Sequence, residues 1–136
     1  MKIKAGIVGG AGYTGGEMLR ILINHPSVEI AFVLSNSNEG NLVSDVHKDL
    51  LGDTDLRFSG QLLQNIDVLF LCVGHGDAKK FLAANPIDST IKIIDLSQDF
   101  RLKAHAANDW VYGLPELNRE AIKSAQHIAN PGCFAT

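Results

Sequence analysis

Cys133 lies in the segment Ala129-Asn130-Pro131-Gly132-Cys133-Phe134-Ala135-Thr136, where its position suits a nucleophile. A thiol is a good nucleophile only as its thiolate, and the amino end of a helix lowers a thiol's pKa toward neutrality. Cys133 follows an apolar run and a Pro-Gly pair, which predicts a strand end leading into such a helix. On this segment alone, a catalytic cysteine and a buried structural cysteine explain the pattern equally well.

A glycine-rich segment near the amino end supplies a second chemical signal. Residues 9–15 read Gly-Gly-Ala-Gly-Tyr-Thr-Gly, which fits both G-x-G-x-x-G and G-x-x-G-x-x-G. Glycines here permit a tight strand-to-helix turn and close backbone approach to a pyrophosphate, which the helix amino end attracts. The pattern alone is weak, but the flanking strand and helix favour a dinucleotide site over a simple turn. With Cys133, it predicts a thiol whose acyl adduct receives hydride from a nicotinamide.

The end of the second expected strand bears on which nicotinamide cofactor binds. An NAD site usually carries an acidic residue about 20 residues after the glycines, where it binds the ribose 2′-hydroxyl. Here the strand ends at Ser35-Asn36-Ser37-Asn38, which has hydroxyls and amides but no carboxylate to repel a 2′-phosphate. This favours NADP, although no arginine lies in the loop.

The remaining polar candidates allow more than one interpretation. His75 lies between two glycines at a strand end, and it either contacts a cofactor or lies on the surface. Cys72 and His75 resemble a metal pair, but zinc needs three or four protein ligands and no second pair is present, so we expect no metal. Cys72 belongs to an apolar strand and is expected in the core. The other histidines have no distinguishing context and are expected to be structural or solvent-facing: His25, His47, His105 and His127.

The segment from Asp95 to Leu102 places two carboxylates, a hydroxyl and a guanidinium at another strand end. Arg101 either forms an ion pair with Asp95 or Asp99, or binds an anion through a bidentate contact. The spacing does not choose between these two roles.

Strands that alternate with helices must position these groups. We expect strands over residues 3–8, 28–34, 56–58, 67–73, 91–96 and 127–129. We expect helices over residues 13–25 and 77–84, a helical turn over 61–65, a functional loop over 97–115, and a helix that Asn118 caps and that runs to about residue 125. This order predicts an α/β fold, a Rossmann-like parallel sheet with helices on both faces, and ligands at the carboxyl ends of the strands.

Composition limits the possible classes of protein. The chain has 136 residues, of which 46% are hydrophobic and 20% charged, and this matches one folded globular domain. A net charge of −3 offers no basic surface for nucleic acid. The longest apolar run, residues 68–73, is far shorter than the roughly 18 residues that span a bilayer, and the first residues do not resemble a secretory signal. We therefore expect a cytoplasmic protein that binds neither membrane nor nucleic acid.

Several segments, taken in order, resemble N-acetyl-gamma-glutamyl-phosphate reductases. The segments are Gly12-Tyr13-Thr14-Gly15, Gly74-His75-Gly76, Asp95-Leu96-Ser97-Gln98-Asp99-Phe100-Arg101-Leu102, Val111-Tyr112-Gly113-Leu114-Pro115-Glu116-Leu117 and Asn130-Pro131-Gly132-Cys133. The resemblance implies an NADPH-dependent reduction of N-acetyl-gamma-glutamyl phosphate to N-acetylglutamate 5-semialdehyde in arginine biosynthesis. It also implies that Cys133 is the nucleophile, which forms a thioester.

The same resemblance implies a set of cofactor-binding residues. They are Gly9, Gly12, Tyr13, Thr14 and Gly15 at the pyrophosphate; Ser35, Asn36 and Ser37 near the adenosine ribose and its phosphate; Val73, Gly74, His75 and Gly76 along the cofactor cleft; and Ser97 and Pro131 near the nicotinamide. Two departures stand out. Many relatives have proline at the position of Gly74, and Tyr-Pro-Thr where this chain has Phe134-Ala135-Thr136.

The resemblance further implies that residues 1–136 are a dinucleotide-binding domain. A carboxyl-terminal domain that carries the histidine acid/base, most of the pocket for the small acyl-phosphate substrate and the contacts of a homo-oligomer is then absent, and this chain alone binds NADP(H) without turnover. Two alternatives stay open: a stand-alone NADP-binding module, and an enzyme like aspartate-semialdehyde dehydrogenase. The second alternative does not account for the segments 99–102 and 112–116.

Overall fold

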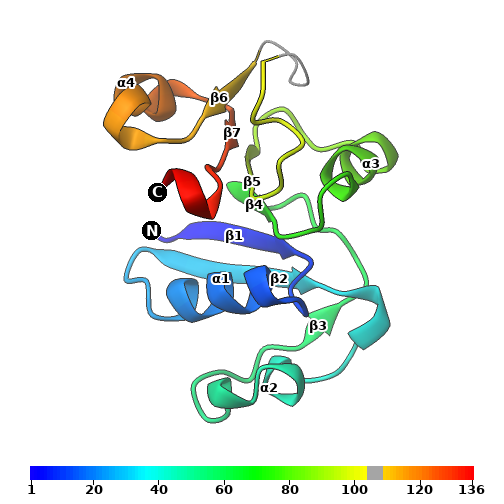
Figure 1. Cartoon of the computed structure of the whole chain (residues 1–136). Helices are drawn as coiled ribbons and strands as arrows, with labels where there is room; N and C mark the ends of the chain where they lie inside the picture. Colours follow the sequence, from blue (N-terminus) through cyan, green and yellow to red (C-terminus); the bar gives the residue numbers. More distant parts are fainter. Residues whose placement is uncertain (104–108) are drawn as a thin grey trace.

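The computed structural model describes residues 1–103 and 109–136, and it confirms the predicted α/β class. Seven strands, all parallel, form one sheet in the order β3-β2-β1-β4-β5-β7-β6 (Figure 1). The strands are β1 (Ile3–Val8), β2 (Val28–Leu34), β3 (Phe58–Ser59), β4 (Val68–Leu71), β5 (Lys92–Asp95), β6 (Trp110–Tyr112) and β7 (His127–Ala129). The helices are α1 (Tyr13–Ile23), α2 (Val43–Val46), α3 (Asp77–Ala84) and α4 (Pro115–Ser124).

The sheet buries its strands because α1 and α3 cover opposite faces. On one face, Leu19 and Leu22 of α1 pack with Ile7 and Val33 of the two neighbouring strands. On the other face, Ala78 of α3 packs in a cluster with side chains of four strands: Val8, Phe32, Leu34, Leu69, Leu71 and Ile93. Strands that are covered on both sides need nearly continuous apolar sequences, which is the pattern that predicted them.

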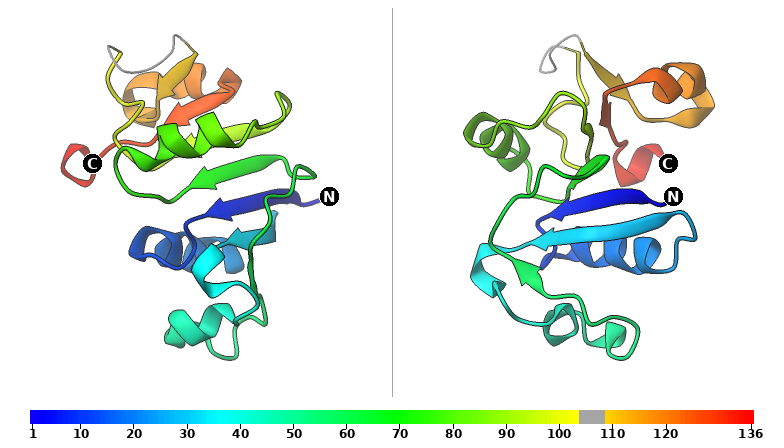
Figure 2. Two further views of the ribbon diagram at one scale, coloured as in Figure 1. Left: turned by 90° about the vertical axis from the view of Figure 1, so that its right-hand side faces the viewer. Right: turned by 180° about the vertical axis from the view of Figure 1, so that it is seen from behind.

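The strand order changes direction beside β1, and this change locates the ligand-binding edge. The chain runs from β1 outward to β2 and β3, then crosses back to β4 on the other side of β1. Open α/β sheets bind ligands outside the carboxyl ends of the strands at such a switch point. In the left view of Figure 2, the arrowheads of β1 and β4 point toward the side where the C-terminus lies. Because β7 is parallel to β1, Cys133, which follows β7, lies at the same edge of the sheet as the glycine-rich turn.

The start of α4 differs from the prediction that Asn118 caps this helix. The helix begins at Pro115, because proline has the φ that a first helical turn requires and lacks the N–H that such a turn leaves unpaired. Asn118 lies inside the helix with non-helical angles (φ −128°, ψ 24°) and donates from Nδ2 to the Tyr112 carbonyl at 2.9 Å. The helix is therefore kinked at Asn118, and a second helical piece runs on from there. The predicted capping hydrogen bond is not observed, and the Asn118 side chain instead ties α4 to β6.

Two further predictions about elements are wrong. Residues 61–65 form no helical turn, because the Gln64 side chain bonds across to the segment after α3, to the Pro86 carbonyl and the Asp88 amide. The expected loop over 97–115 contains strand β6, which pairs with β7. The prediction that His105 is structural or solvent-facing lies outside the described residues.

An aromatic stack fixes the β6 edge of the sheet. The Trp110 ring stacks on Phe100 with centroids 3.9 Å apart and an interplanar angle of 3°, and on His127 at 5.0 Å. His127 Nδ1 lies 2.5 Å from Asp109 Oδ2, so this histidine has the structural role that the sequence predicted. Within the described ranges, no helix has both the length and the apolar character needed to cross a membrane.

Candidate active site

The glycine-rich turn begins where β1 ends, and its first glycine cannot carry a side chain. Gly9 has φ +79°, and a Cβ there would lie 2.3 Å from the Cys72 carbonyl oxygen. The amides of Gly9 and Gly10 both donate to the Leu34 carbonyl at 3.2 Å. The turn is therefore fixed against the ends of both β2 and β4.

Gly15 and Gly12, the other two glycines of G-x-x-G-x-x-G, differ in their surroundings: Gly15 is closely packed, whereas Gly12 faces open space. A Cβ on Gly15 would lie 2.3 Å from the Gly9 carbonyl oxygen, so α1 packs directly on the turn. A Cβ on Gly12 would meet only that same oxygen, at 3.7 Å, so this side of the turn is open. Gly9 thus forms the tight turn, Gly12 leaves an open side and Gly15 permits close helix packing, at the three glycine positions of G-x-x-G-x-x-G.

The amino end of α1 is free to attract an anion. The residue at its N-cap is Gly12, which offers no side chain, and the first turn contains no acidic residue. Tyr13 and Thr14 are exposed. Amides of the first helical turn have no partner within the helix, and the helix dipole places partial positive charge there. This end of α1 has the features of a pyrophosphate site.

Ser35, Asn36 and Ser37 follow β2 at the same edge. Asn38 Nδ2 donates to the hydroxyl oxygens of Ser35, at 3.1 Å, and Ser37, at 3.2 Å. A hydroxyl that accepts a hydrogen bond keeps its own proton to donate. Both hydroxyls can therefore donate to a phosphate, which is the chemistry the sequence predicted for this loop.

The loop after β4 carries Val73, Gly74, His75 and Gly76. Gly76 has φ +87° and is the N-cap residue of α3. The main-chain amide of Gln98 donates to His75 Nδ1 at 3.1 Å. In the neutral ring, His75 therefore carries its proton on Nε2, which keeps a donor available on the exposed side of the residue.

Asp99 occupies the amino end of α3. Its carboxylate accepts from the Gly76 amide at 2.6 Å and the Lys79 amide at 3.1 Å. Burial alone would raise the pKa of Asp99, but these two bonds and the Lys79 charge outweigh burial, and the pKa lies below its ordinary value. Asp99 is thus a charged cap that positions the His75 loop.

Ser97 lies beneath this loop, buried against the Asp95 carboxylate. Its hydroxyl donates to Asp95 Oδ2 at 2.7 Å and accepts from the Asp99 amide at 3.1 Å. Burial raises the pKa of Asp95 even though Ser97 bonds to its charged form. Since the Ser97 hydroxyl already donates its only proton to Asp95, it can offer a ligand only an acceptor lone pair.

Arg101 connects the loops that follow β5 and β7. Nε donates to the Asn130 carbonyl at 2.8 Å and Nη2 donates to the Leu96 carbonyl at 2.9 Å. Arg101 forms no ion pair with Asp95 or Asp99, so that predicted role is wrong. A Cβ on Gly132 would lie 3.1 Å from Nη1, which places the guanidinium directly beside the Pro-Gly-Cys segment.

Cys133 begins a single 3₁₀ turn, Cys133–Ala135, after β7. Its side chain is exposed, whereas the neighbouring Pro131 is buried. Cys72 is buried as predicted, and burial together with the Asp95 charge raises the pKa of its thiol to about 12. Cys133 is therefore the accessible thiol. In the described part of the chain, no side chain forms a hydrogen bond with Cys133 Sγ.

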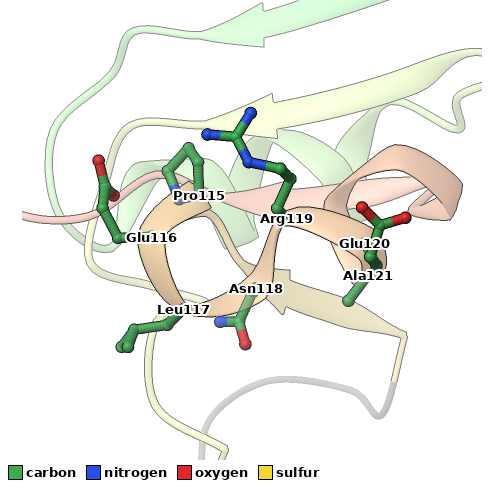
Figure 3. A pocket seen from close by; sticks show the side chains of 7 residues that line it. All are labelled: Pro115, Glu116, Leu117, Asn118, Arg119, Glu120 and Ala121. Atoms are coloured by element: carbon green, nitrogen blue, oxygen red, sulfur yellow. The ribbon is translucent and has the colours of Figure 1, made fainter.

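A cavity of about 680 Å³ separates the loops after β4 and β5. It is lined by His75, Gly76, Lys79, Gln98, Asp99, Arg101 and Leu102. It contains two of the predicted cofactor-binding residues, His75 and Gly76. A hollow of about 620 Å³ on α4 contains none of them, because all its lining residues come from the first turns of that helix (Figure 3).

No feature of the sequence marks His47 as functional, but the structure places it against the glycine-rich turn. His47 is 8% exposed, and its Nε2 lies 2.7 Å from the Gly10 carbonyl oxygen. The two residues are 37 positions apart, and no motif or helical period marks the segment around His47. Only the chain's course after β2 brings them together.

The family of the chain follows from a comparison with family models. Residues 4–125 match the model described as "Semialdehyde dehydrogenase, NAD binding domain". The chain belongs to this family, which accounts for the glycine-rich turn, the parallel sheet and the switch point beside β1.

Curated relatives with more than half of their aligned residues identical to this chain are named N-acetyl-gamma-glutamyl-phosphate reductase. The protein of Bacteroides thetaiotaomicron is 59% identical over 135 residues, which cover 98% of this chain and 42% of the relative. Those of Phocaeicola vulgatus and Parabacteroides distasonis are 58% and 56% identical, with the same coverage. The chain therefore spans about 42% of the length of these relatives.

Solved structures share the fold at lower sequence identity. Aspartate semialdehyde dehydrogenase II from Vibrio cholerae, complexed with ASA, superposes with a TM-score of 0.74 at 23% identity, covering 98% of this chain and 43% of that one. Aspartate semialdehyde dehydrogenase with NADP from Candida albicans gives 0.71 at 15% identity, covering 98% and 44%. At these identities the likeness establishes the fold alone.

Proposed function

We propose that this chain is the NADP-binding part of an N-acetyl-gamma-glutamyl-phosphate reductase. The proposed reaction is the reductive dephosphorylation of N-acetyl-gamma-glutamyl phosphate to N-acetylglutamate 5-semialdehyde in arginine biosynthesis. The observation that carries the proposal is an exposed Cys133 that follows the carboxyl end of β7, at the sheet edge that holds the glycine-rich turn. The 59% identity to a reductase of that name supports the choice of substrate.

Cys133 is the proposed nucleophile. Its thiolate attacks the acyl carbon, a C–S bond forms, and the C–O bond to phosphate breaks, which leaves a thioester and inorganic phosphate. A bound NADPH would supply the hydride that reduces this thioester to the aldehyde level. Arg101 holds the Asn130 carbonyl and so fixes the loop from which Cys133 projects. Buried Pro131 limits the movement of the same loop.

The residues that would hold the cofactor have the chemistry it needs. Gly9 forms the tight turn, and the open side at Gly12 with the amides of Tyr13, Thr14 and Gly15 suits the pyrophosphate. Ser35 and Ser37 keep hydroxyl donors for a 2′-phosphate, with Asn36 between them. Val73, Gly74, His75 and Gly76 would line the cleft, and Ser97 and Pro131 would lie nearer the nicotinamide.

The proposed division of labour places the rest of the catalytic machinery outside residues 1–136. We assign the histidine acid/base, most of the substrate pocket and the contacts of a homo-oligomer to the part of the relatives that this chain does not cover. The chain by itself then binds cofactor without turnover. The proposed setting is the cytoplasm, with a small acyl phosphate as the substrate that NADPH reduces and no nucleic acid or membrane partner.

Cofactor choice is tested by calorimetric titration of this chain with NADPH and NADH. We expect NADPH to bind at least about tenfold more tightly, because a 2′-phosphate gains charge-assisted hydrogen bonds from the loop after β2. Ser35→Asp places a carboxylate where NAD sites have one and should reverse the preference. Equal affinity for both cofactors in both proteins would contradict the assignment of this loop.

Catalysis is tested in a chimera that replaces the matching residues of the Bacteroides thetaiotaomicron relative with this chain. We expect phosphate-dependent NADP⁺ reduction with N-acetylglutamate 5-semialdehyde and none with aspartate semialdehyde. Cys133→Ala in the chimera should abolish it. A chimera that unfolds cooperatively yet oxidises neither aldehyde would refute the reductase proposal, and activity with aspartate semialdehyde alone would favour the competing enzyme.

A further inference from the structure

We propose that His47 is a positioning residue of the cofactor site, which sets the orientation of the Gly10–Ala11 peptide in the glycine-rich turn. The inference deepens the proposed cofactor function and rests on it. It extends the dinucleotide site along the β2–β3 connection, from the loop that directly follows β2 to the segment around His47, which belongs to none of the motifs that the sequence revealed.

The contact between His47 and the turn is buried and specific. Nε2 lies 2.7 Å from the Gly10 oxygen, and a carbonyl oxygen only accepts, so the ring donates from Nε2. Among the described residues, no backbone amide outside the regular elements donates to this carbonyl. His47 is therefore the hydrogen-bond partner that satisfies it.

The His47 ring fits against α1 because residue 16 is a glycine. A Cβ on Gly16 would lie 2.6 Å from His47 Cε1 and 2.8 Å from Nδ1. The two consecutive glycines in α1 thus have separate purposes. Gly15 lets the helix approach the turn, and Gly16 lets the ring lie against the helix.

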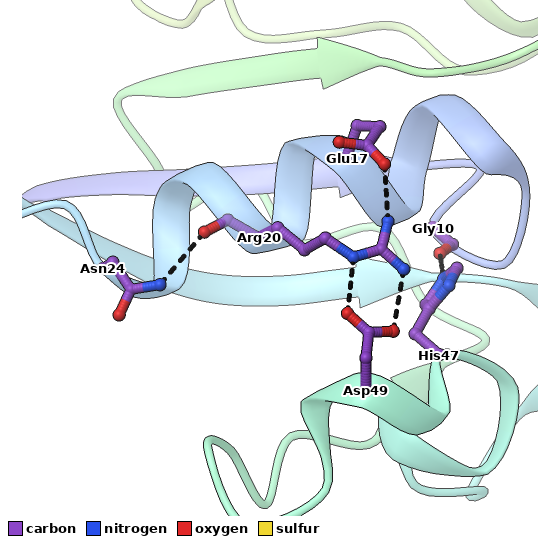
Figure 4. A network of polar contacts seen from close by, with 6 residues as sticks. All are labelled: Gly10, Glu17, Arg20, Asn24, His47 and Asp49. Carbon is purple, nitrogen blue, oxygen red and sulfur yellow. Dashed lines mark hydrogen bonds and ion pairs between the residues drawn. The ribbon is translucent and has the colours of Figure 1, made fainter.

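The 3₁₀ turn that directly follows His47, Lys48–Leu50, is hydrogen-bonded to α1. Asp49 accepts two hydrogen bonds from Arg20, from Nε at 2.7 Å and from Nη2 at 2.8 Å (Figure 4). Arg20 also bonds Glu17 on its own helix, at 2.8 Å. The hydrogen bond and charge of Arg20 lower the pKa of Asp49 to about 2. The main-chain amide of His47 donates to the Val43 carbonyl at 2.9 Å, so the ring's backbone is held on both sides.

Peptide geometry links this contact to the cofactor. The Gly10 carbonyl and the Ala11 N–H belong to one planar trans peptide and point in opposite directions. A donor that fixes the carbonyl therefore also aims the Ala11 N–H. That amide donates to no backbone carbonyl among the described turn contacts, and it lies beside Gly12, where the turn is open. His47 thus holds a free donor ready for a phosphate oxygen.

The test compares His47→Leu with His47→Gln in this chain. Leucine fills the space without a donor, whereas the glutamine amide can still donate to Gly10. We expect His47→Leu to weaken NADPH binding about tenfold, the effect of one lost hydrogen bond, and His47→Gln to stay within about threefold of the wild type. We also expect faster hydrogen exchange at the Ala11 amide in His47→Leu alone. Val43→Ala is the matched control, because it loosens the same segment without touching Gly10.

The readouts separate this inference from the proposed function. If the wild-type chain does not bind NADPH, the proposed function fails, and Ala11 exchange still decides the role of His47. The inference is overturned if His47→Leu keeps wild-type affinity and exchange, if His47→Gln is as weak as His47→Leu, or if Val43→Ala weakens binding equally. Should His47→Leu not fold, His47→Asn, whose amide is one methylene shorter, replaces it.

Discussion

Cys133 and Cys72 differ in how accessible the thiol is to a reagent. Cys133 is exposed, whereas burial and the Asp95 charge raise the pKa of Cys72 to about 12. We predict that iodoacetamide at pH 8 modifies one thiol per native chain and two in denaturant, as counted by mass spectrometry. Cys133→Ser should leave the native chain unmodified, and labelling of Cys72 in that variant would contradict the buried environment.

We predict that adding a methyl group at Gly12 mainly lowers NADPH affinity, whereas adding one at Gly15 mainly lowers the free energy of unfolding. Gly12→Ala meets open space at φ −81° and loses only a favourable N-cap residue, so the free energy of unfolding should fall by about 0.5 kcal/mol while NADPH affinity falls. Gly15→Ala forces a Cβ against the Gly9 carbonyl and should lower the free energy of unfolding by about 1–3 kcal/mol. Urea titration and calorimetry measure the two effects. Equal loss of stability in both variants would contradict the division of roles.

Among single residues, the sequence predicted those that belong to a short local motif. The spacing of the glycines and the Pro-Gly-Cys run was informative because turns depend on neighbouring residues. The partners of Arg101 and His47 were not predictable, because Asn130 and Gly10 are 29 and 37 positions away from them and meet them only in the folded sheet.

The helix α3 depends on Asp99 for its amino-terminal cap, and this dependence should vary with pH. The lowered pKa of Asp99 means that its stabilisation is present above the ordinary aspartate value of about 3.9 and is lost as pH falls through the folded value. Asp99→Asn should cost about 1 kcal/mol of unfolding free energy at pH 7, since an amide has one acceptor oxygen. The difference from the wild type should shrink in urea titrations as pH falls below the ordinary aspartate value and through the lower folded one. A constant difference would show that the charge is unimportant.

Elements were predictable where a regular pattern or a neighbouring motif marks them. The predictions for β1, β2 and α3 match the observed bounds, because a buried strand or an amphipathic helix imposes its pattern on every residue. The short strand β7 was predicted with its observed bounds because it leads into the Pro-Gly-Cys segment. The equally short strand β6 was missed because it lies at the edge, where pairing with β7 and stacking of Trp110 decide its conformation.

The whole molecule should unfold locally from the edges of the sheet inward. β1 is hydrogen-bonded to both β2 and β4 and its last four residues are buried, whereas β3 and β6 each have one neighbouring strand. We predict the slowest amide hydrogen exchange in β1 and β4 and the fastest strand exchange in β3 and β6. Protection of β6 equal to that of β1 would require a second partner for that edge.

Trp110 is the only tryptophan in the chain, and its stack between Phe100 and His127 gives the molecule a built-in optical probe. Phe100 sits between Asp99, which caps α3, and Arg101, which holds the cysteine loop. Intrinsic fluorescence therefore reports on one place, the junction between the cofactor cleft and the β6 edge. Energy transfer from the excited indole to a reduced nicotinamide would measure how close the bound ring comes to this junction, without a label or a substitution.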